Sequence, residues 1–597
     1  MTATPHSVST TSPSSVEPQA PDLLLRGGRV TTLDTVQSEV TAVLLHDGRV
    51  AAIGADREVT AAAGPGTHIV ELAGRRVVPG LNDSHLHLVR GGLNWSLELR
   101  WDGVPSLADA LTLLRAQAQR TPAGQWVRVV GGWSEHQFAE HRAPTLAELN
   151  AAAPDTPVFV LHLYRAALLN AAALRALGID TTTPDPPGGH IERDSAGRPT
   201  GLLLATPSAL ILYSTLARAP RLSPTDQAIS SRLFMRELNR LGVTSAIDAG
   251  GGAQSYPDDY DVISELAADN ELTVRVAFNI FAQRAGAELD DYRSFTGLTG
   301  PGSDRAADRW YRFNGAGENV VWAAADFENF TQPRPDLGAG TEDRLADVLR
   351  LLVGERWPFR LHATYDQTMR RMLDVIERVD REVGLGGLRW FFDHAETATP
   401  ATLERIAALG GGLAVQNRMA FQGEAFAQRY GAAAAATAPP LRRALDLGLS
   451  LGAGTDATRV SSYNPWYALH WLVSGRTAGG LLLRDGHDRL DRFEALRSFT
   501  NGAAWFSGEQ ADKGRLTPGY LADLAVLSED YFTVAEERIP HLYSVLTVVG
   551  GRIVHGAAEH AALAPPSPAP SPDWSPLTLP GHPVPLPTDG HVDPCLL

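Results

Sequence analysis

Near both ends of the chain, apolar and polar positions alternate in short runs. Residues 22–34 and 39–55 show this alternation, broken by Gly and Asp-Gly turns, which is typical of short strands. The same pattern returns at 514–530 and 544–556. Two matching segments that flank a long middle predict one discontinuous β-sheet unit built from both chain ends.

In the middle of the chain, apolar runs alternate with longer amphipathic stretches that are typical of helices. That alternation predicts βα units and a parallel sheet. Several of the runs end in His or Asp, and in a (β/α) barrel the catalytic residues lie at the carboxyl ends of the strands. The strand-like runs of this middle part lie at 126–133, 156–162, 243–250, 273–281, 357–364, 389–396, 412–417 and 449–457, and we expect an α/β fold with a (β/α) barrel.

These patterns divide the chain into four parts. Residues 1–21 are expected to be a flexible leader, and residues 559–597, rich in Pro, a disordered tail. The β-sandwich is assigned to 22–78 plus 503–558. The barrel is assigned to 79–502, with an insertion over about 92–240 that is too long for a simple connection.

Composition narrows the function. The 597 residues are 44% hydrophobic and 20% charged, as in soluble globular proteins, and the net charge of −16 argues against binding nucleic acid. No apolar run is long enough for a membrane span, and the single cysteine, Cys595, permits no intrachain disulfide. We expect a cytoplasmic protein with a small-molecule substrate, and the sequence leaves a homodimer open.

The first candidate metal ligands are His85 and His87, which close the run VVPGLNDSHLHL. Alternate residues of a strand point to the same side, so both imidazoles can face one metal ion. An H-x-H pair is a weak signal by itself in a chain with 18 histidines.

Three further polar residues close later apolar runs: His362 in RLHAT, His394 in FFDHAE and Asp456 in LSLGAGTDA. Taken singly, each histidine could be a hydrogen-bonded structural residue, and Asp456 could cap the following helix. Their order along successive strand ends, H-x-H, H, H and D, is far more specific than any one of them.

This order resembles the amidohydrolase superfamily, and in particular its YtcJ-like amidohydrolase-3 branch. The resemblance covers residues 22–558 and includes PGLNDSHLHL, GGHIERDSAGRPTGLLL, GVTSAIDAG and KGRLTPGYLADLAVL. It implies a distorted TIM (β/α)8 barrel with a small, discontinuous β-sandwich made from both chain ends, in agreement with the pattern of the strands.

The resemblance also implies roles for the strand-end residues. His85, His87, His362 and His394 become metal ligands, Asp456 a ligand and proton shuttle, and Asp456 and His394 the catalytic pair. Imidazole and carboxylate ligands suit Zn²⁺, with Fe²⁺ or Mn²⁺ as alternatives. The implied reaction is hydrolysis of an amide, N-acyl or N-formyl bond of a small, uncharged organic substrate by an activated water. Hydrolysis of a cyclic amide or ester, deamination, and a catalytically silent barrel with a binding role stay open.

The chain departs from the family at the bridging lysine that many binuclear members carboxylate. The segment is YRFNGAGEN, where Arg312 stands at the lysine position, and Lys513 is the only lysine of the chain. An arginine stays protonated and cannot be carboxylated. We therefore expect a single metal ion, or otherwise a carboxylate bridge from Asp248 or Glu318.

Candidate substrate-contacting residues follow two other runs of the insertion. Trp133, Glu135 and His136 come together in GGWSEHQF, and His162 closes the next run; Arg312 is a further candidate. The alternative for each is a structural role in the core. Arg165, Ala205 or Thr206, and Glu396 replace a His, a Glu and a Gln that the family pattern has, which puts the substrate in doubt more than the chemistry.

Overall fold

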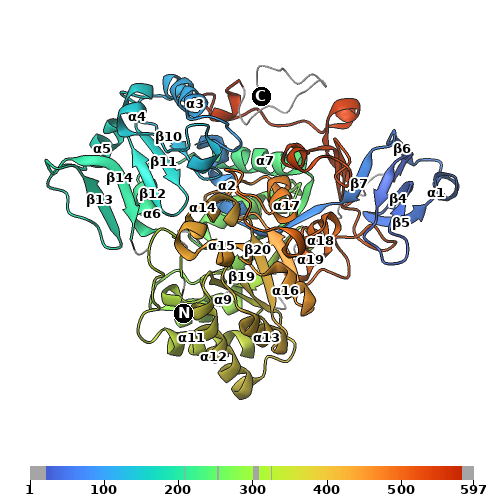
Figure 1. Ribbon diagram of the computed structural model, residues 1–597. Helices are drawn as coiled ribbons and strands as arrows, with labels where there is room; N and C mark the ends of the chain where they lie inside the picture. The colour runs from blue at the N-terminus through green and yellow to red at the C-terminus, as the bar shows by residue number, and fades with distance from the viewer. Residues whose placement is uncertain are drawn as a thin grey trace, which may run out of the picture.

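The computed structural model describes residues 22–206, 209–251, 254–299, 308–324, 326–327 and 329–580. The leader at 1–21 and the last part of the tail, 581–597, lie outside these residues. A central barrel carries a β-sandwich on one side and an inserted α/β unit on the other (Figure 1). The predicted fold class is confirmed.

Eight parallel strands form the barrel, in the order β21-β20-β19-β18-β17-β16-β15-β8. Its two outer strands meet where Asp456 N, just after β21, donates to His85 O at 2.8 Å. The strands are buried over nearly their whole length, which explains their continuous apolar sequences. Their bounds are β8 (Leu81–Leu86), β15 (Val243–Asp248), β16 (Arg275–Ile280), β17 (Tyr311–Ala316), β18 (Phe359–Ala363), β19 (Trp390–His394), β20 (Gly412–Gln416) and β21 (Ser450–Gly454).

Helices follow the barrel strands and bury their apolar faces against the sheet. The longest, α12 (Asp366–Val383), buries Met369, Met372, Leu373 and Ile376, which share one face at helical spacing. The other helices of this layer are α2 (Leu88–Asn94), α7 (Pro224–Arg240), α8 (Asp261–Ala268), α9 (Glu288–Thr299), α11 (Thr341–Gly354), α13 (Pro400–Ala408), α14 (Met419–Tyr430), α15 (Ala432–Ala436), α16 (Leu441–Asp446), α17 (Pro465–Ser474), α18 (Arg492–Ser498) and α19 (Asn501–Trp505).

Both chain ends build the β-sandwich. One sheet has the order β5-β4-β1-β6 and the other the order β24-β23-β22-β7-β2-β3, and their apolar residues share one core. The helix α1 (Asp56–Ala62) covers the first sheet. The strands are β1 (Leu23–Arg26), β2 (Arg29–Thr31), β3 (Glu39–Val40), β4 (Ala42–His46), β5 (Arg49–Gly54), β6 (His68–Glu71), β7 (Arg76–Pro79), β22 (Leu524–Leu527), β23 (Ser544–Val549) and β24 (Arg552–Gly556).

The insertion forms a separate six-stranded sheet, in the order β13-β14-β12-β11-β10-β9. Val460, from the loop after β21, belongs to the core of this unit and joins it to the barrel. Its elements are β9 (Glu98–Leu99), α3 (Leu107–Arg120), β10 (Val127–Val129), α4 (Leu146–Ala152), β11 (Val158–His162), β12 (Ala166–Leu169), α5 (Ala171–Leu177), β13 (Gly189–Arg193), β14 (Pro199–Ala205) and α6 (Leu210–Leu216). The strand-like runs at 126–133 and 156–162 supply β10 and β11 of this sheet.

The tail is ordered over its first part, contrary to the expectation for 559–597. Gln117 Nε2 donates to Trp574 O at 2.9 Å, and Ser575 Oγ donates to Ser96 O at 2.7 Å. These bonds satisfy polar groups along the insertion, so residues rich in Pro gain a fixed path with only short 3-10 turns, at Ala558–Leu563 and Pro576–Thr578. Within the described residues, no helix is long and apolar enough to cross a membrane.

A buried ion pair fixes the sandwich to the barrel. Arg275 of β16 donates to both oxygens of Asp523, at 2.8 and 3.2 Å, and both side chains are 4% exposed. We predict that Asp523→Ala lowers the free energy of unfolding by about 3 kcal/mol, because it leaves the arginine charge buried without its partner. Thermal unfolding measures the loss.

The control is the exposed pair Arg350–Glu382, whose Nε–Oε2 distance of 2.7 Å is just as short. Glu382→Ala should leave the free energy of unfolding almost unchanged because solvent screens the pair. Equal losses in the two variants would contradict the anchoring role of Asp523.

Candidate metal centre

The strand-end residues predicted as ligands lie together at one rim of the barrel. His85 belongs to β8, His362 to β18 and His394 to β19, while His87 and Asp456 directly follow β8 and β21. The carboxyl ends of parallel barrel strands open on the same face, which brings distant parts of the chain together. All five side chains are at most 4% exposed.

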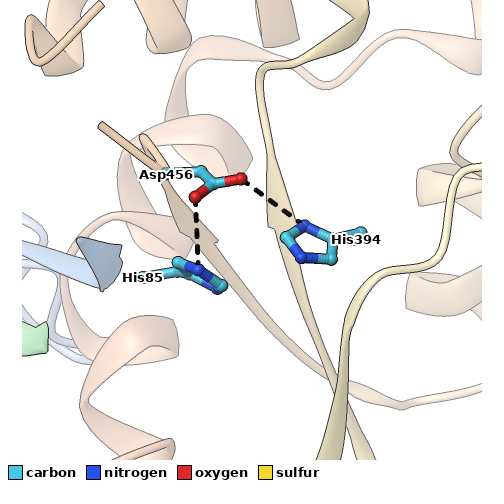
Figure 2. A group of neighbouring side chains, drawn as sticks. All are labelled: His85, His394 and Asp456. Carbon is cyan, nitrogen blue, oxygen red and sulfur yellow. Dashed lines mark ion pairs between the residues drawn. The ribbon is translucent and has the colours of Figure 1, made fainter. Parts of the chain in front are cut away.

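Asp456 lies between the imidazoles of His85 and His394 (Figure 2). Its Oδ1 is 3.4 Å from His85 Nε2, and its Oδ2 is 3.9 Å from His394 Nδ1. The same Oδ1 is 3.1 Å from His87 Nε2. One carboxylate thus reaches three of the four histidines.

Glu318 is a second carboxylate at the centre of the cluster. It follows β17, and its Oε2 lies 3.0 Å from His362 Nδ1, 3.1 Å from His394 Nε2 and 3.8 Å from His85 Nε2. Its Oε1 lies 3.8 Å from His87 Nε2. Glu318 therefore touches both halves of the histidine set, which is the place that a bridging ligand occupies.

The donor set fits a divalent metal ion. His85 Nε2 and His394 Nδ1 are buried without a hydrogen-bond partner among the described residues, yet both face Asp456. A buried nitrogen without a hydrogen-bond partner is energetically unfavourable unless it binds a ligand. The ligand atoms form three close groups: His85, His394 and Asp456; His85, His87 and Glu318; and Glu318, His362 and His394. Nitrogen and oxygen ligands of this kind suit Zn²⁺, Fe²⁺ or Mn²⁺.

Electrostatics at the centre favour a cation. Burial and Arg360 lower the pKa of His85, but Asp393, Asp456 and Glu318 outweigh them and raise it to about 10. The carboxylates therefore create a negative potential that stabilises positive charge at this position.

The orientation of His85 is set from behind the site. Its Nδ1 lies 2.9 Å from Asp393 Oδ1 and 2.7 Å from Arg360 Nη2, and Arg360 Nε donates to Asp393 Oδ2 at 2.7 Å. These contacts engage Nδ1 and leave Nε2 as the ring atom that could bind a metal ion. Asp393, which directly precedes His394 in β19, therefore positions the imidazole of His85 in β8.

The backbone is strained at two of the ligands. His394 has φ 77° and Asp456 has φ 53°, values that residues other than glycine seldom adopt. Such strain is retained where the surrounding structure fixes a functional conformation. His394 ends β19 and Asp456 follows β21, and the turn at each strand end directs the side chain into the cluster.

The structure separates the expected substrate-contacting residues of the insertion. Trp133 is fully buried, donates from Nε1 to Leu161 O at 2.9 Å and packs on Trp101, which is a core role. Glu135, His136 and His162 instead line a small cavity between the insertion and α14.

The cavity contains a polar triad. Glu135 Oε2 is 2.6 Å from His162 Nε2, and Glu135 Oε1 is 3.3 Å from Arg165 Nη2. Burial opposes ionisation of Glu135, but these two partners hold its pKa below the usual range. Arg165, which replaces a histidine of the family pattern, thus neutralises an ionised Glu135.

Arg312 does not reach the metal centre. It is the second residue of β17, four residues before the strand ends, and its Nη1 lies 3.6 Å from Glu509 Oε1. Glu509 also binds Lys513, with Oε2 2.8 Å from Nζ. Arg312 therefore belongs to an ion-pair network away from the carboxyl ends of the strands, and Glu318 occupies the central place instead.

The other carboxylate considered as a bridge, Asp248, is also excluded by its contacts. Its Oδ1 accepts from Val89 N at 3.0 Å, and its Oδ2 accepts from the Tyr260 hydroxyl at 3.1 Å. These bonds hold α2 against β15. Asp248 is therefore structural.

A parallel barrel with a buried set of imidazoles and carboxylates at its rim is the arrangement found in metal-dependent hydrolases. The family model described as the amidohydrolase family matches residues 68–555. The chain belongs to that family and is an enzyme of the hydrolase class.

Two curated proteins match along nearly their whole length. The N-substituted formamide deformylase of Arthrobacter pascens is 28% identical over 561 residues, covering 89% of this chain and 98% of that protein. YtcJ of Bacillus subtilis is 25% identical over 539 residues, with 89% and 98% coverage. A metal-dependent hydrolase structure from Pyrococcus horikoshii matches the fold with a TM-score of 0.60 at 22% identity, covering 86% of this chain and 99% of that one.

The role of Asp393 gives a prediction. Asp393→Asn should weaken metal binding by about 10–100-fold, because the amide no longer fixes the His85 tautomer. Titration against a chromophoric chelator measures the affinity. Asp291→Asn is the control, since Asp291 is a buried carboxylate whose partners are Arg284 and backbone amides. Unchanged affinity in Asp393→Asn would remove Asp393 from the metal centre.

Proposed function

We propose that the protein hydrolyses the amide bond of a small N-acyl or N-formyl compound. The convergence of four imidazoles and two carboxylates in one buried cluster carries this proposal. The match to a formamide deformylase over most of both chains supports a formyl or other small acyl group.

A bound divalent ion, which we propose to be Zn²⁺, supplies Lewis-acid polarisation of the carbonyl and activates water. The protein contributes the proton transfers. Burial opposes ionisation of Asp456, but His85, His87 and His394 hold its pKa well below the usual range. Asp456 is thus ionised at neutral pH, ready to accept a proton from the attacking water and to return it to the leaving nitrogen.

His394 is held in its neutral form. Burial and the charge of Arg418 lower the pKa of His394 to about 3. A neutral imidazole is the form that binds a metal. Arg418 donates to both oxygens of Glu396, at 3.0 and 3.1 Å, so a buried ion pair fixes this charge close to the centre.

We further propose that Glu318 bridges two metal positions, in place of the single ion that the sequence favoured. Its contacts with both histidine pairs support this role. A glutamate bridge needs no carboxylated lysine, which this chain lacks at the barrel rim.

The hydrolytic proposal is tested at Asp456. Asp456→Asn should lower kcat by about 10²–10⁴-fold, because the amide cannot accept the water proton. A panel of N-formyl and N-acetyl amines measures turnover, and Asp291→Asn serves as the control. Turnover close to that of the unmodified protein in Asp456→Asn would refute the assigned role, and no turnover of any amide by the metal-loaded enzyme would refute the proposed substrate class.

The bridging proposal is tested by metal analysis. The unmodified protein should hold about two equivalents of metal and Glu318→Gln about one or fewer, because the neutral amide is a poor ligand. Glu288→Gln is the matched control, since Glu288 is also buried but accepts from Trp322 N. A content of one equivalent in both the unmodified protein and Glu318→Gln would restore the single-metal expectation.

A further inference from the structure

Two buried arginines lie near the candidate metal centre, each three residues after a candidate ligand. Arg90 follows the ligand His87 by three residues, in α2, and Arg459 follows Asp456 by three residues. Their exposed fractions are 4% and 9%. Each guanidinium is therefore carried about one turn of chain beyond a proposed ligand.

Neither arginine has an acidic partner. All three guanidinium nitrogens of Arg90, and Nε and Nη1 of Arg459, are buried without a hydrogen-bond acceptor among the described residues. No ion pair joins either one to a described carboxylate, whereas Arg360, also at the centre, pairs with Asp393. Burying two unpaired charges is expensive unless something supplies the counter-charge.

The acids that act on these arginines are already engaged, since Asp456, which raises the pKa of Arg90, lies among the histidines of the cluster. Glu98 Oε2 lies 3.3 Å from Arg100 Nη1, and burial raises the pKa of Glu98 in spite of four nearby arginines. Burial and the neighbouring charge of Arg90 lower the pKa of Arg459. The region thus keeps an excess of positive charge.

An aromatic wall connects the arginines to the metal ligands. Arg459 Cζ lies 4.6 Å from the Tyr213 ring centre, and the Tyr213 and Tyr164 ring centres are 5.6 Å apart. Tyr164 is 6.4 Å from Phe327, which is 5.5 Å from the ligand His362. The insertion contributes both tyrosines, so it closes this side of the centre.

We propose that Arg90 and Arg459 bind a carboxylate of the substrate, so that the enzyme acts on an N-formyl or N-acyl amino acid with an aromatic side chain. This deepens the proposed amide hydrolysis, on which it rests, and replaces the uncharged substrate that the sequence suggested. Guanidinium groups bind carboxylates through paired, charge-assisted hydrogen bonds. The aromatic wall offers a surface for the side chain.

The test compares N-formylphenylalanine with N-formyl-2-phenylethylamine, which differ only in the carboxylate. The unmodified enzyme should prefer the acid by at least about 10-fold in kcat/KM. Arg90→Gln and Arg459→Gln should each reduce this preference by about 10–100-fold, and the lysine variants should keep part of it. Equal kcat/KM for the two compounds, or a full preference in both glutamine variants, would overturn the assignment.

Arg484→Gln is the matched control. Arg484 is a buried arginine without a described carboxylate partner, and its Cζ lies 4.3 Å from the Trp471 ring centre. This variant should keep the preference for the acid. Thermal unfolding shows which variants fold. If a glutamine variant does not fold, the lysine variant at the same position tests the assignment in its place.

A binding experiment separates this inference from the proposed reaction. Calorimetry on the metal-loaded enzyme should show 3-phenylpropionate binding that weakens at least about 10-fold in Arg90→Gln or Arg459→Gln. Such binding without amide turnover would keep the carboxylate site and reject the reaction. Unchanged affinity in both variants would mean that the carboxylate binds the metal, which would overturn the inference.

Discussion

The balance of buried charge at the barrel rim is the constraint on which the rest of the structure depends. Two carboxylates, Asp456 and Glu318, lie among four imidazoles with almost no access to solvent. Such a cluster is costly in water-free surroundings unless a cation compensates the carboxylates. The rigid strands, the strained turns at His394 and Asp456, and the Asp393–Arg360 pair hold these groups in place before any cation binds.

Much of the fold and half of the site could be predicted from sequence, because strand ends are local features. His85, His362 and His394 each close an apolar run, and the barrel brings such ends together whatever the intervening sequence. The central position of Glu318 has no equally local signal. It follows its strand in GAGEN, and aligning the missing lysine with Arg312 drew attention to the wrong end of that strand.

Other features depended on contacts that no sequence pattern specifies. Asp393 and Arg360 both contact His85 Nδ1 from more than 270 residues later in the chain, so only the closed barrel shows these contacts. Trp133 looked like a pocket residue because it precedes Glu135 and His136, but its indole is fixed inside the insertion. The prediction of a disordered tail relied on composition, whereas hydrogen bonds to Gln117 and Ser96 order its first part.

The insertion gives the centre a wall that the barrel lacks. Tyr164 and Tyr213 come from its sheet and helix, and Val460 from the barrel packs into its core. Because Val460 is next to Arg459, the docking of the insertion also fixes the loop that carries Asp456.

The placement of Arg90 and Arg459 has a consequence for how this enzyme can evolve. Each arginine lies three residues after a proposed ligand, so a change that moves either guanidinium also disturbs His87 or Asp456. New preferences are therefore more accessible through the tyrosines of the insertion, which lie between β11 and β12 (Tyr164) and in α6 (Tyr213). The barrel loops would then keep the residues of the reaction, while the substrate-facing residues of the insertion would change.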